Sequence, residues 1–437
     1  MGADPSIYAA RRERLMQAMG PRAVGLFRAP PERIRNGDAH YPYRQSSDLF
    51  YLTGFSEPDS ALVLRPGAEK ERATLYVRPR DPEREVWDGR RAGPEGAARD
   101  HGVDAAYPIE ELDKRLLELV ANIDDVYHSL GLLPELDAAL AAAIARLRLS
   151  ERRVGRPPKR IVDPRGALHE LRLRKTPDEV DLLARAAAIT AEAHVAAMRA
   201  ARPGAFEYEL QAVIEYTFRR RGALGPGYAS IVGAGVNATI LHYVDNTARL
   251  EAGQLVLVDA GAELDYYTAD VTRTFPCGGR FSPAQRRVYD LVLAAQEEAI
   301  RMTRPGATLD QIHDRVVELL TAGLVDLGLL QGDPKERVAD GAYRRYYMHR
   351  TSHWLGMDVH DVGAYGRDDG SARPLEPGMV ITIEPGLYVS AADETAPAEL
   401  RGLGVRIEDD LLVTDDGHRN LTAEIPKQAA ELERICG

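Results

Sequence analysis

The stretch LVLVDAGAELDYYTADVTRTFP, residues 255–276, combines two strand-like segments with two carboxylates. The continuous apolar run 255–258 ends in Asp259, and the alternating segment 266–274 contains Asp270. Runs of this length and alternation predict two β-strands. The connecting residues Ala-Gly-Ala-Glu-Leu predict a short hairpin that sets Asp259 and Asp270 side by side.

Two further carboxylates lie on predicted strands downstream. Glu384 ends an apolar segment, and Glu408 lies within the predicted strand 405–413. The two-residue period of a strand places Arg406 and Glu408 on one face. Burying an ionised carboxylate without a partner is costly, and lysines are scarce nearby. Four such groups therefore predict that metal ions supply the counter-charge.

A histidine-rich segment supplies a nitrogen ligand for such a site. The sequence HRTSHW, residues 349–354, is followed by His360 and Asp361. Mostly oxygen ligands with one imidazole suit Mn²⁺, Co²⁺ or Zn²⁺, and four carboxylates are more than one ion requires, which favours two ions. Taken singly, each feature has a simpler interpretation, such as a surface ion pair or an exposed helix face that carries His349 and His353.

Two predicted helix pairs recur about a hundred residues apart. The sequences TPDE at 176–179 and SPAQ at 282–285 are capping boxes with proline at the first helical position. Each predicted helix stops at an Arg-Pro-Gly-Ala sequence, at 202–205 and 304–307, and a second helix follows. We expect two similar halves within 176–437; chance recurrence of a common helix-ending sequence is the alternative.

The first 150 or so residues are predicted to mix strands and helices. Strands are expected at 60–64 and 73–77, and helices at 112–120 and 136–149. The segment 152–166 is dense in arginine and proline, and proline ends helices and restricts its neighbour. We expect a linker or domain boundary there. The predicted fold class is α+β, with helices carried on a sheet.

The composition is that of an ordinary globular protein, with 44% hydrophobic and 28% charged residues among 437. It excludes a disordered chain, a collagen and a disulfide scaffold. The net charge of −11 makes nucleic acid and anionic membranes poor partners. Cys277 and Cys436 are the only cysteines, so there is no disulfide framework. No stretch approaches the 18 consecutive apolar residues of a membrane span, and no secretory signal is recognisable. We therefore expect a cytoplasmic protein.

Six segments together resemble one family, aminopeptidase P, the Xaa-Pro aminopeptidases. Four lie in the second part of the chain: VLVDAGAELDYYTADVTRTFP at 256–276, SHWLGMDVHD at 352–361, ITIEPGLY at 381–388 and GVRIEDD at 404–410. Two resemble the N-terminal domain of the family: RNGDAHYPYRQSSDLFYLTGF at 35–55 and REVWDGRR at 84–91.

The resemblance covers nearly the whole chain and implies its domain organisation. It implies a pita-bread metallopeptidase domain with two pseudo-symmetric halves over residues 173–437. A smaller α/β domain of the aminopeptidase P type is implied over residues 1–172. The repeated Arg-Pro-Gly-Ala sequence agrees independently with two halves.

The resemblance also implies the residues that hold metal. Carried over by position, the ligands are Asp259, Asp270, His353, Glu384 and Glu408. Asp270 and Glu408 match the carboxylates that bridge two divalent ions, commonly Mn²⁺ in this family. Glu384 is also implied to accept and return a proton during catalysis.

Further positions match residues that contact substrate or orient the ligands. His242, His349 and His360 match the active-site histidines, and are implied in catalysis and in substrate binding. Arg406 matches an arginine that orients a metal-binding carboxylate, and Tyr228 matches a tyrosine that hydrogen-bonds near the metals and contacts substrate.

Four positions carry other implications. Trp87 and Asp38 resemble substrate-binding residues that, in oligomeric members, reach a neighbouring subunit's site. Arg350-Thr351 departs from the family pattern, because some members carry glycine followed by a small or apolar residue there. Substrate preference is therefore not transferred through this dipeptide.

The function implied is that of a dinuclear metal-dependent aminopeptidase. Such an enzyme releases the first residue from peptides with proline second, using a hydroxide derived from a water shared by the two ions. Family members commonly form dimers or tetramers, and we expect a homo-oligomer. The alternatives are a prolidase, which acts on X-Pro dipeptides, and a non-catalytic pita-bread module that binds protein partners.

Overall fold

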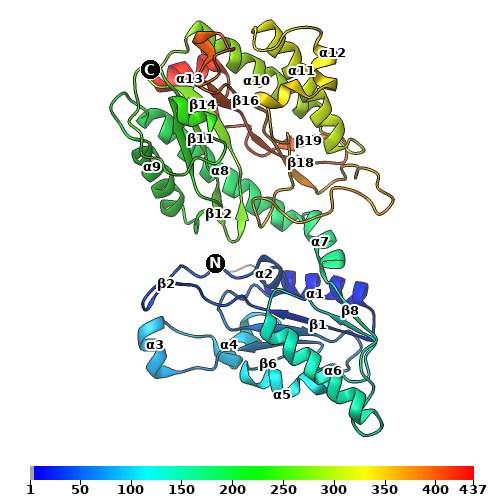
Figure 1. The fold of residues 1–437 in the computed structure, drawn as a ribbon. Coiled ribbons are helices and arrows are strands. Elements are labelled where there is room, and N and C mark those ends of the chain that lie inside the picture. The colour runs from blue at the N-terminus through cyan, green and yellow to red at the C-terminus, as the bar shows by residue number, and fades with distance from the viewer. Residues whose placement is uncertain (1–3) are drawn as a thin grey trace. The chain divides into compact units, whose positions relative to one another are not determined.

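The computed structural model describes residues 4–437 and contains two compact units. The first comprises residues 1–171 and the second residues 172–437. In Figure 1 the chain runs from blue at its N-terminus, through cyan and green, to red at its C-terminus. No helix in the described part of the chain is long and apolar enough to cross a membrane.

The N-terminal unit is built around a mixed six-stranded sheet with the strand order β6-β5-β4-β1-β7-β8. The strands are β1 (Ala23–Arg28), β4 (Ala61–Leu64), β5 (Ala73–Val77), β6 (Ala105–Pro108), β7 (Asp125–Tyr127) and β8 (Arg160–Val162). Strand β4 is antiparallel to both of its neighbours, and the other three pairings are parallel. A separate hairpin consists of β2 (Ile34–Asn36) and β3 (Ala39–His40).

Several helices accompany this sheet in the N-terminal unit. They are α1 (Pro5–Met19), α2 (Ser47–Thr53), α3 (Pro82–Asp88), α4 (Gly93–Asp100), α5 (Glu110–Leu119), α6 (Pro134–Val154) and the start of α7 (Arg165–Leu173). The apolar faces of α5 and α6 share one buried cluster with the sheet, in which Leu116 and Leu140 meet Val24 and Val126. The predicted strands at 60–64 and 73–77 correspond to β4 and β5, and the predicted helices to α5 and α6.

The structure corrects the prediction of a linker at 152–166. Helix α6 continues to Val154, and residues 160–162 form β8, which pairs with β7 in the sheet. Three residues give no alternation that a sequence pattern can detect. The strand exists because it pairs with a segment more than thirty residues away.

Two helix pairs organise the C-terminal unit. The first is α8 (Pro177–Ala200) with α9 (Glu207–Arg220), and the second is α10 (Pro283–Met302) with α11 (Leu309–Asp326). Both predicted capping boxes are present: the Thr176 N–H donates to the Glu179 carboxylate at 2.9 Å, and the Ser282 N–H donates to Gln285 Oε1 at 2.8 Å. Two shorter helices follow: α12 (Pro334–Ala339) comes after α11, and α13 (Ala429–Cys436) lies at the end of the chain.

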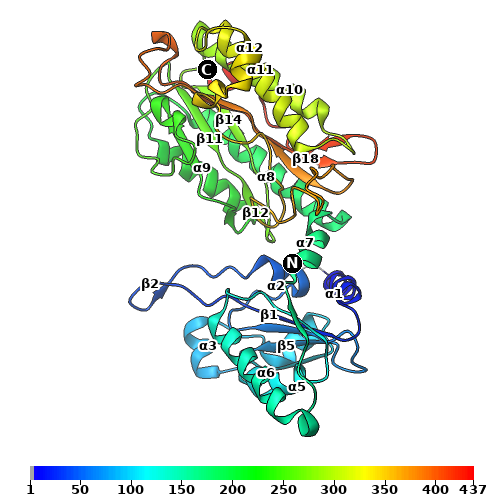
Figure 2. The ribbon, with the colours of Figure 1, turned by 45° about the vertical axis from the view of Figure 1, so that its right-hand side comes forward.

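Each helix pair is followed in the sequence by an antiparallel three-stranded sheet. The first contains β10 (Ile231–Ala234), β11 (Leu255–Asp259) and β14 (Thr272–Pro276), and the second contains β15 (Val380–Ile383), β18 (Asp409–Val413) and β19 (His418–Asn420). Smaller pairings involve β9 (Gly225–Pro226), β12 (Ala262–Leu264), β13 (Tyr267–Thr268), β16 (Gly386–Tyr388) and β17 (Gly404–Arg406). Figure 2 shows helices α8 to α11 outside these strands. The expectation of two similar α+β halves is therefore confirmed.

The strands that carry the carboxylates are interrupted where continuous strands were predicted. Asp270 lies in a break between β13 and β14, and Glu408 lies in a break between β17 and β18. The turn between β12 and β13 consists of Asp265 and Tyr266, both with positive φ (47° and 71°), as a type I′ hairpin turn requires. The predicted hairpin therefore exists, but its turn lies farther along the chain, and β11 pairs with β14.

A close backbone crossing supports the first break. A Cβ atom at Gly261 would lie 1.7 Å from the carbonyl oxygen of Ala269, so only glycine fits there. The Ala260 N–H donates to the Val271 carbonyl at 3.0 Å. The two sides of the break are thus held together although Asp270 leaves the regular ladder.

His194 of α8 fixes the backbone at the end of β11. Its side chain is completely buried, and Nε2 donates to the carbonyl of Ala260, at 3.0 Å. Its other ring nitrogen is buried without a hydrogen-bond partner in the described part of the chain. Burial lowers the pKa of His194 to about 4, so the ring is neutral at pH 7.

This histidine predicts a pH-dependent component of folding stability. In the unfolded chain His194 is protonated below its ordinary pKa of 6.5, whereas in the folded chain it is protonated only below about pH 4. Folding stability therefore falls as the pH drops from 6.5 to about 4. The loss from this one group is about 3 kcal/mol. Urea unfolding between pH 7 and pH 4 measures it. His194→Met should flatten this part of the pH profile, whereas His40→Met, at an exposed position, should not. The same slope in His194→Met and in the wild type would contradict the assignment.

Candidate active site

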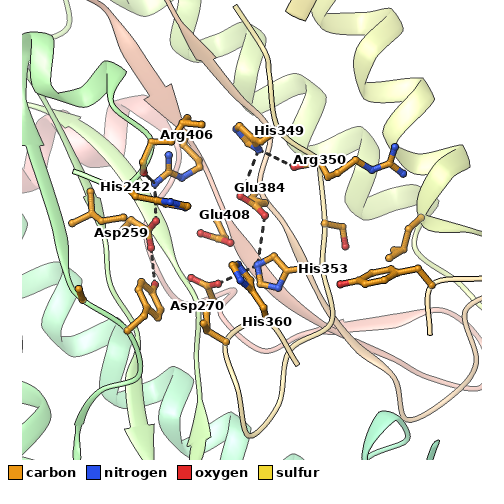
Figure 3. A pocket seen from close by; sticks show the side chains of 18 of the residues that line it. His242, Asp259, Asp270, His349, Arg350, His353, His360, Glu384, Arg406 and Glu408 are labelled. Carbon is orange, nitrogen blue, oxygen red and sulfur yellow. Dashed lines mark hydrogen bonds and ion pairs between the residues drawn. The ribbon is translucent and has the colours of Figure 1, made fainter. Parts of the chain in front are cut away.

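A pocket of about 940 Å³ in the C-terminal unit brings together the carboxylates and imidazoles singled out above. Figure 3 shows the strand ends and loops that carry them around one space. Ten of the predicted site residues line it: Tyr228, His242, Asp259, Asp270, His349, His353, His360, Glu384, Arg406 and Glu408. The residues come from both halves of the unit, because Asp259 and Asp270 precede α10 whereas Glu384 and Glu408 follow α11.

Asp270, His353 and Glu408 form the centre of this cluster. One ligand atom of each lies within 4.8 Å of the other two. His353 Nε2 is 3.3 Å from Asp270 Oδ2 and 3.5 Å from Glu384 Oε1. The other ring nitrogen, Nδ1, donates to the carbonyl of Trp354 at 3.0 Å. Such a bond from Nδ1 directs Nε2 toward the carboxylates, as in histidines that bind metal.

Fixed donors orient the outer oxygens of the carboxylates. The Tyr228 hydroxyl donates to Asp259 Oδ1 at 2.6 Å, and Arg406 Nη2 donates to Asp259 Oδ2 at 2.6 Å. The Thr272 hydroxyl donates to Glu408 Oε2 at 2.6 Å. These contacts hold Asp259 and Glu408 in single orientations, which is what preorganised ligands need.

The cluster carries more negative than positive charge. Burial, reinforced by Asp270 and Glu384, raises the pKa of Glu408 well above its ordinary value. Burial and the neighbouring Asp270 also raise the pKa of Glu384, to about 7, although His353 opposes the shift. Burial raises the pKa of Asp259 even though Arg406 lies against it. Like charges held this close disfavour ionisation, so the carboxylate cluster is short of compensating positive charge.

His353 responds to the same excess of negative charge. Burial alone would lower the pKa of His353, but the hydrogen bond to Asp270 and the charge of Glu384 raise it to about 9. The imidazole thus holds a proton at the point where several carboxylates face inward. Mostly oxygen donors with one imidazole are the set that divalent ions such as Mn²⁺ take, so the residues fit a metal site.

A hydrogen-bonded chain leads from Asp259 to His349. Arg406 Nη1 donates to the Tyr388 hydroxyl at 2.9 Å, and that hydroxyl donates to His349 Nε2 at 2.9 Å. His349 Nδ1 donates to the carbonyl of Arg350 at 2.8 Å. Burial, with Arg406 nearby, lowers the pKa of His349 to about 3, so this ring is neutral and its proton lies on Nδ1.

Tyr388 and Thr272 are site residues that the sequence analysis missed. Both lie inside quoted segments, 381–388 and 256–276. Their proximity to predicted ligands in the chain was the available signal. Neither residue type indicates a role by itself, because tyrosine and threonine are ordinary residues of strands.

His242 and His360 are exposed within the pocket. The His360 ring is 4.5 Å from the His353 ring in an edge-to-face contact. In Figure 3 His242 is drawn beside Asp259 and Arg406, and His360 beside Asp270 and His353. The two imidazoles therefore border the carboxylate cluster at different places.

A buried ion cluster holds the loop between His353 and His360. Asp361 Oδ1 accepts from Arg172 Nη2 at 2.6 Å, and Oδ2 accepts from Lys175 Nζ at 2.9 Å. The side chains of Asp361, Arg172 and Lys175 are almost fully buried. The Asp361 N–H donates to the Trp354 carbonyl at 2.9 Å, which closes the loop.

Trp87 and Asp38 belong to the N-terminal unit. Trp87 follows Val86 in α3 and is 86% exposed, and Asp38 lies in the turn between β2 and β3, where it is also exposed. Neither is among the residues that line this pocket.

Comparison with known proteins identifies the family. The model of metallopeptidase family M24 matches residues 181–415, and the model of the aminopeptidase P N-terminal domain matches residues 8–127. The Xaa-Pro aminopeptidase of Escherichia coli (strain K12) is 44% identical over 429 residues, which cover 98% of this chain and 97% of the relative. The Xaa-Pro aminopeptidase of Haemophilus influenzae is 45% identical over 430 residues, which cover 98% and 96%.

Solved structures agree over the whole chain. An aminopeptidase from Pseudomonas aeruginosa superimposes with a TM-score of 0.97 at 48% identity, covering 99% of this chain and 98% of that one. A variant of Escherichia coli aminopeptidase P in complex with substrate has a TM-score of 0.96 at 43% identity, covering 100% and 99%. The chain is a peptidase that belongs to metallopeptidase family M24 and carries the N-terminal domain of aminopeptidase P.

Proposed function

We propose that this protein is a two-metal Xaa-Pro aminopeptidase, which releases the first residue from peptides with proline in second place. One observation carries the proposal: four carboxylates and an imidazole from separate strands and loops converge in one pocket. The relatives named Xaa-Pro aminopeptidase match nearly the full length of the chain, which supports the same substrate class.

The arrangement of ligands supports two ions rather than one. In Figure 3 Asp270 and Glu408 are drawn between Asp259 on one side and His353 on the other. Asp270 and Glu408 would contact both ions, Asp259 would complete one set of ligands, and His353 with Glu384 would complete the other. A set rich in carboxylates suits Mn²⁺, which we propose as the metal.

The ions would supply the main chemistry, because a pair of divalent ions lowers the pKa of water and polarises a carbonyl. Glu384 would accept the proton of the attacking water and pass it to the leaving nitrogen. The position of its carboxylate beside His353 Nε2, at 3.5 Å, supports this role. A proton shuttle works best when its pKa lies near the working pH.

The histidines would bind and orient the peptide. His242 and His360 are exposed in the pocket, so their N–H groups can donate to the carbonyl oxygen where negative charge develops. His349 is half-buried and neutral, and its edge would contact the proline ring. Arg406 would hold Asp259, and Tyr228 would both orient Asp259 and border the substrate.

The chemistry of proline explains the specificity. The X–Pro bond is a tertiary amide without an N–H group, so a site that required this donor would reject proline. A closely fitting niche for the ring beside His349 or His360 favours proline instead. The free amino group of the first residue would lie near the carboxylates, which restricts cleavage to the peptide's N-terminus.

Several further expectations belong to this proposal. The catalytic domain would span residues 173–437 and the N-terminal domain residues 1–172. The chain would act in the cytoplasm as a dimer or tetramer, in which Trp87 and Asp38 reach a neighbouring subunit's site. The two free cysteines support a reducing compartment.

Replacing Glu384 tests the proton transfer. Glu384→Gln should lower kcat by about 10²–10⁴-fold, the usual contribution of a positioned acid–base group. Single-turnover kinetics on an X-Pro-Y peptide measure the chemical step. Glu424→Gln, at an exposed position of the same unit, is the matched control. A kcat near that of the wild type in Glu384→Gln would remove this role from Glu384.

A small peptide panel tests the substrate class. X-Pro, X-Pro-Y and X-Ala-Y peptides with added Mn²⁺, analysed by mass spectrometry, should show release of X chiefly from X-Pro-Y. The physical reason is that the pocket extends beyond the carboxylate cluster, as far as Asp310 and Arg350. Cleavage confined to X-Pro would instead indicate a prolidase, and no cleavage of any peptide would favour a non-catalytic module.

A further inference from the structure

We propose that Arg350 is a specificity-determining residue that recognises a carboxylate in the part of the peptide that follows proline. The inference rests on the proposed function and deepens it, because it assigns a charge preference to the same pocket. The carboxylate can belong to an acidic side chain or to the C-terminus of a short peptide, and both present the same chemistry to a guanidinium group.

The pocket is electrically asymmetric. Its inner part contains the carboxylate cluster, where Glu408 is only 2% exposed. Its rim contains Arg350, whose side chain is 58% exposed, and Arg373 also lines this pocket. In Figure 3 the Arg350 guanidinium is directed away from Glu384 and the cluster. A peptide carries its positive amino group at the end that the cluster attracts, so its later residues extend toward the rim.

The backbone at Arg350 is held rigidly. Its carbonyl accepts from His349 Nδ1 at 2.8 Å. The next residue, Thr351, is 1% exposed, and its hydroxyl is hydrogen-bonded to Tyr347 at 2.7 Å and to His313 Nδ1 at 2.9 Å. The backbone at Arg350 is therefore fixed next to His349, and only the side chain of Arg350 moves. Its guanidinium can reach a limited and defined region of the pocket.

The guanidinium has one partner that a substrate can replace. Arg350 is paired with Asp310, and both side chains are more than half exposed. Exposed ion pairs contribute little to stability, so exchange of Asp310 for a substrate carboxylate is cheap. Asp310 lies in the first turn of α11, where the helix N-terminus favours negative charge. The negative charge of Asp310 is therefore still stabilised when Arg350 turns away from it.

Arginine is well suited to this role, because its guanidinium binds carboxylates through two parallel hydrogen bonds. Asp310 and His313, the partners of Arg350 and Thr351, both belong to α11. Residues 350 and 351 are thus each paired with a residue of the same helix.

Peptides that differ only in charge test this assignment. The series Ala-Pro-Z-Ala-amide, with Z as Glu, Gln or Lys, separates charge from size. We expect kcat/KM for the wild type to be about tenfold higher with Glu than with Gln, mainly through KM, as one charge-assisted hydrogen bond provides. A comparison of Ala-Pro-Ala with its C-terminal amide measures recognition of the terminal carboxylate separately.

Variants then assign the preference to Arg350. Arg350→Gln should abolish the preference for Glu, Arg350→Glu should reverse it toward Lys, and Asp310→Asn should strengthen it because the competing carboxylate is gone. Arg419→Gln, at an exposed arginine of β19, should behave as the wild type. Arg373→Ala separates the contribution of Arg373, which lines the same pocket.

The possible failures are distinguishable. Equal kcat/KM for Glu, Gln and Lys in the wild type, or an unchanged preference in Arg350→Gln, would overturn the inference while cleavage itself upholds the proposed function. No cleavage of any X-Pro peptide would overturn both.

Discussion

The structure of the C-terminal unit depends on the burial of four carboxylates in one pocket. Asp259, Asp270, Glu384 and Glu408 cannot all be ionised there without cations. Burial, reinforced by the neighbouring carboxylates, raises the pKa values of Asp259, Glu384 and Glu408. Arg406 and a protonated His353 offset only part of the negative charge. Divalent ions would compensate the remaining negative charge. The burial of four carboxylates, which by itself destabilises the protein, therefore provides the groups that hold metal for hydrolysis.

The fold supplies these carboxylates in pairs. Each half of the unit provides one carboxylate where a strand ends, Asp259 or Glu384, and another in a break between two short strands, Asp270 or Glu408. A residue in a break can turn into the pocket while its neighbours continue the sheet. Contacts such as the one between Gly261 and Ala269 keep the broken segments together. The duplication of helices and strands thus places two similar pairs of carboxylates in one pocket.

The sequence predicted the elements whose signals are local. Proline and the capping residues at 176–179 and 282–285 define helix starts within four residues. The breaks at Asp270 and Glu408 were not predictable, because the alternation of side chains continues through them. Strand β8 was missed since it exists only through pairing with β7. Thr272 and Tyr388 were missed because their hydrogen bonds join segments far apart in the chain. The four carboxylates could be singled out because ionised groups at the ends of apolar strands are costly to bury.

The metal content of the purified chain tests the central claim most directly. Equilibrium dialysis of the metal-free protein against Mn²⁺, followed by elemental analysis, should give two ions per chain in the wild type. Glu408→Gln should bind fewer ions and lose the rise in Tm that Mn²⁺ gives the wild type, because ligand binding to the folded state stabilises it. Glu424→Gln should retain both. An unchanged Tm and no bound ion in the wild type, or two ions bound as tightly by Glu408→Gln, would contradict the account.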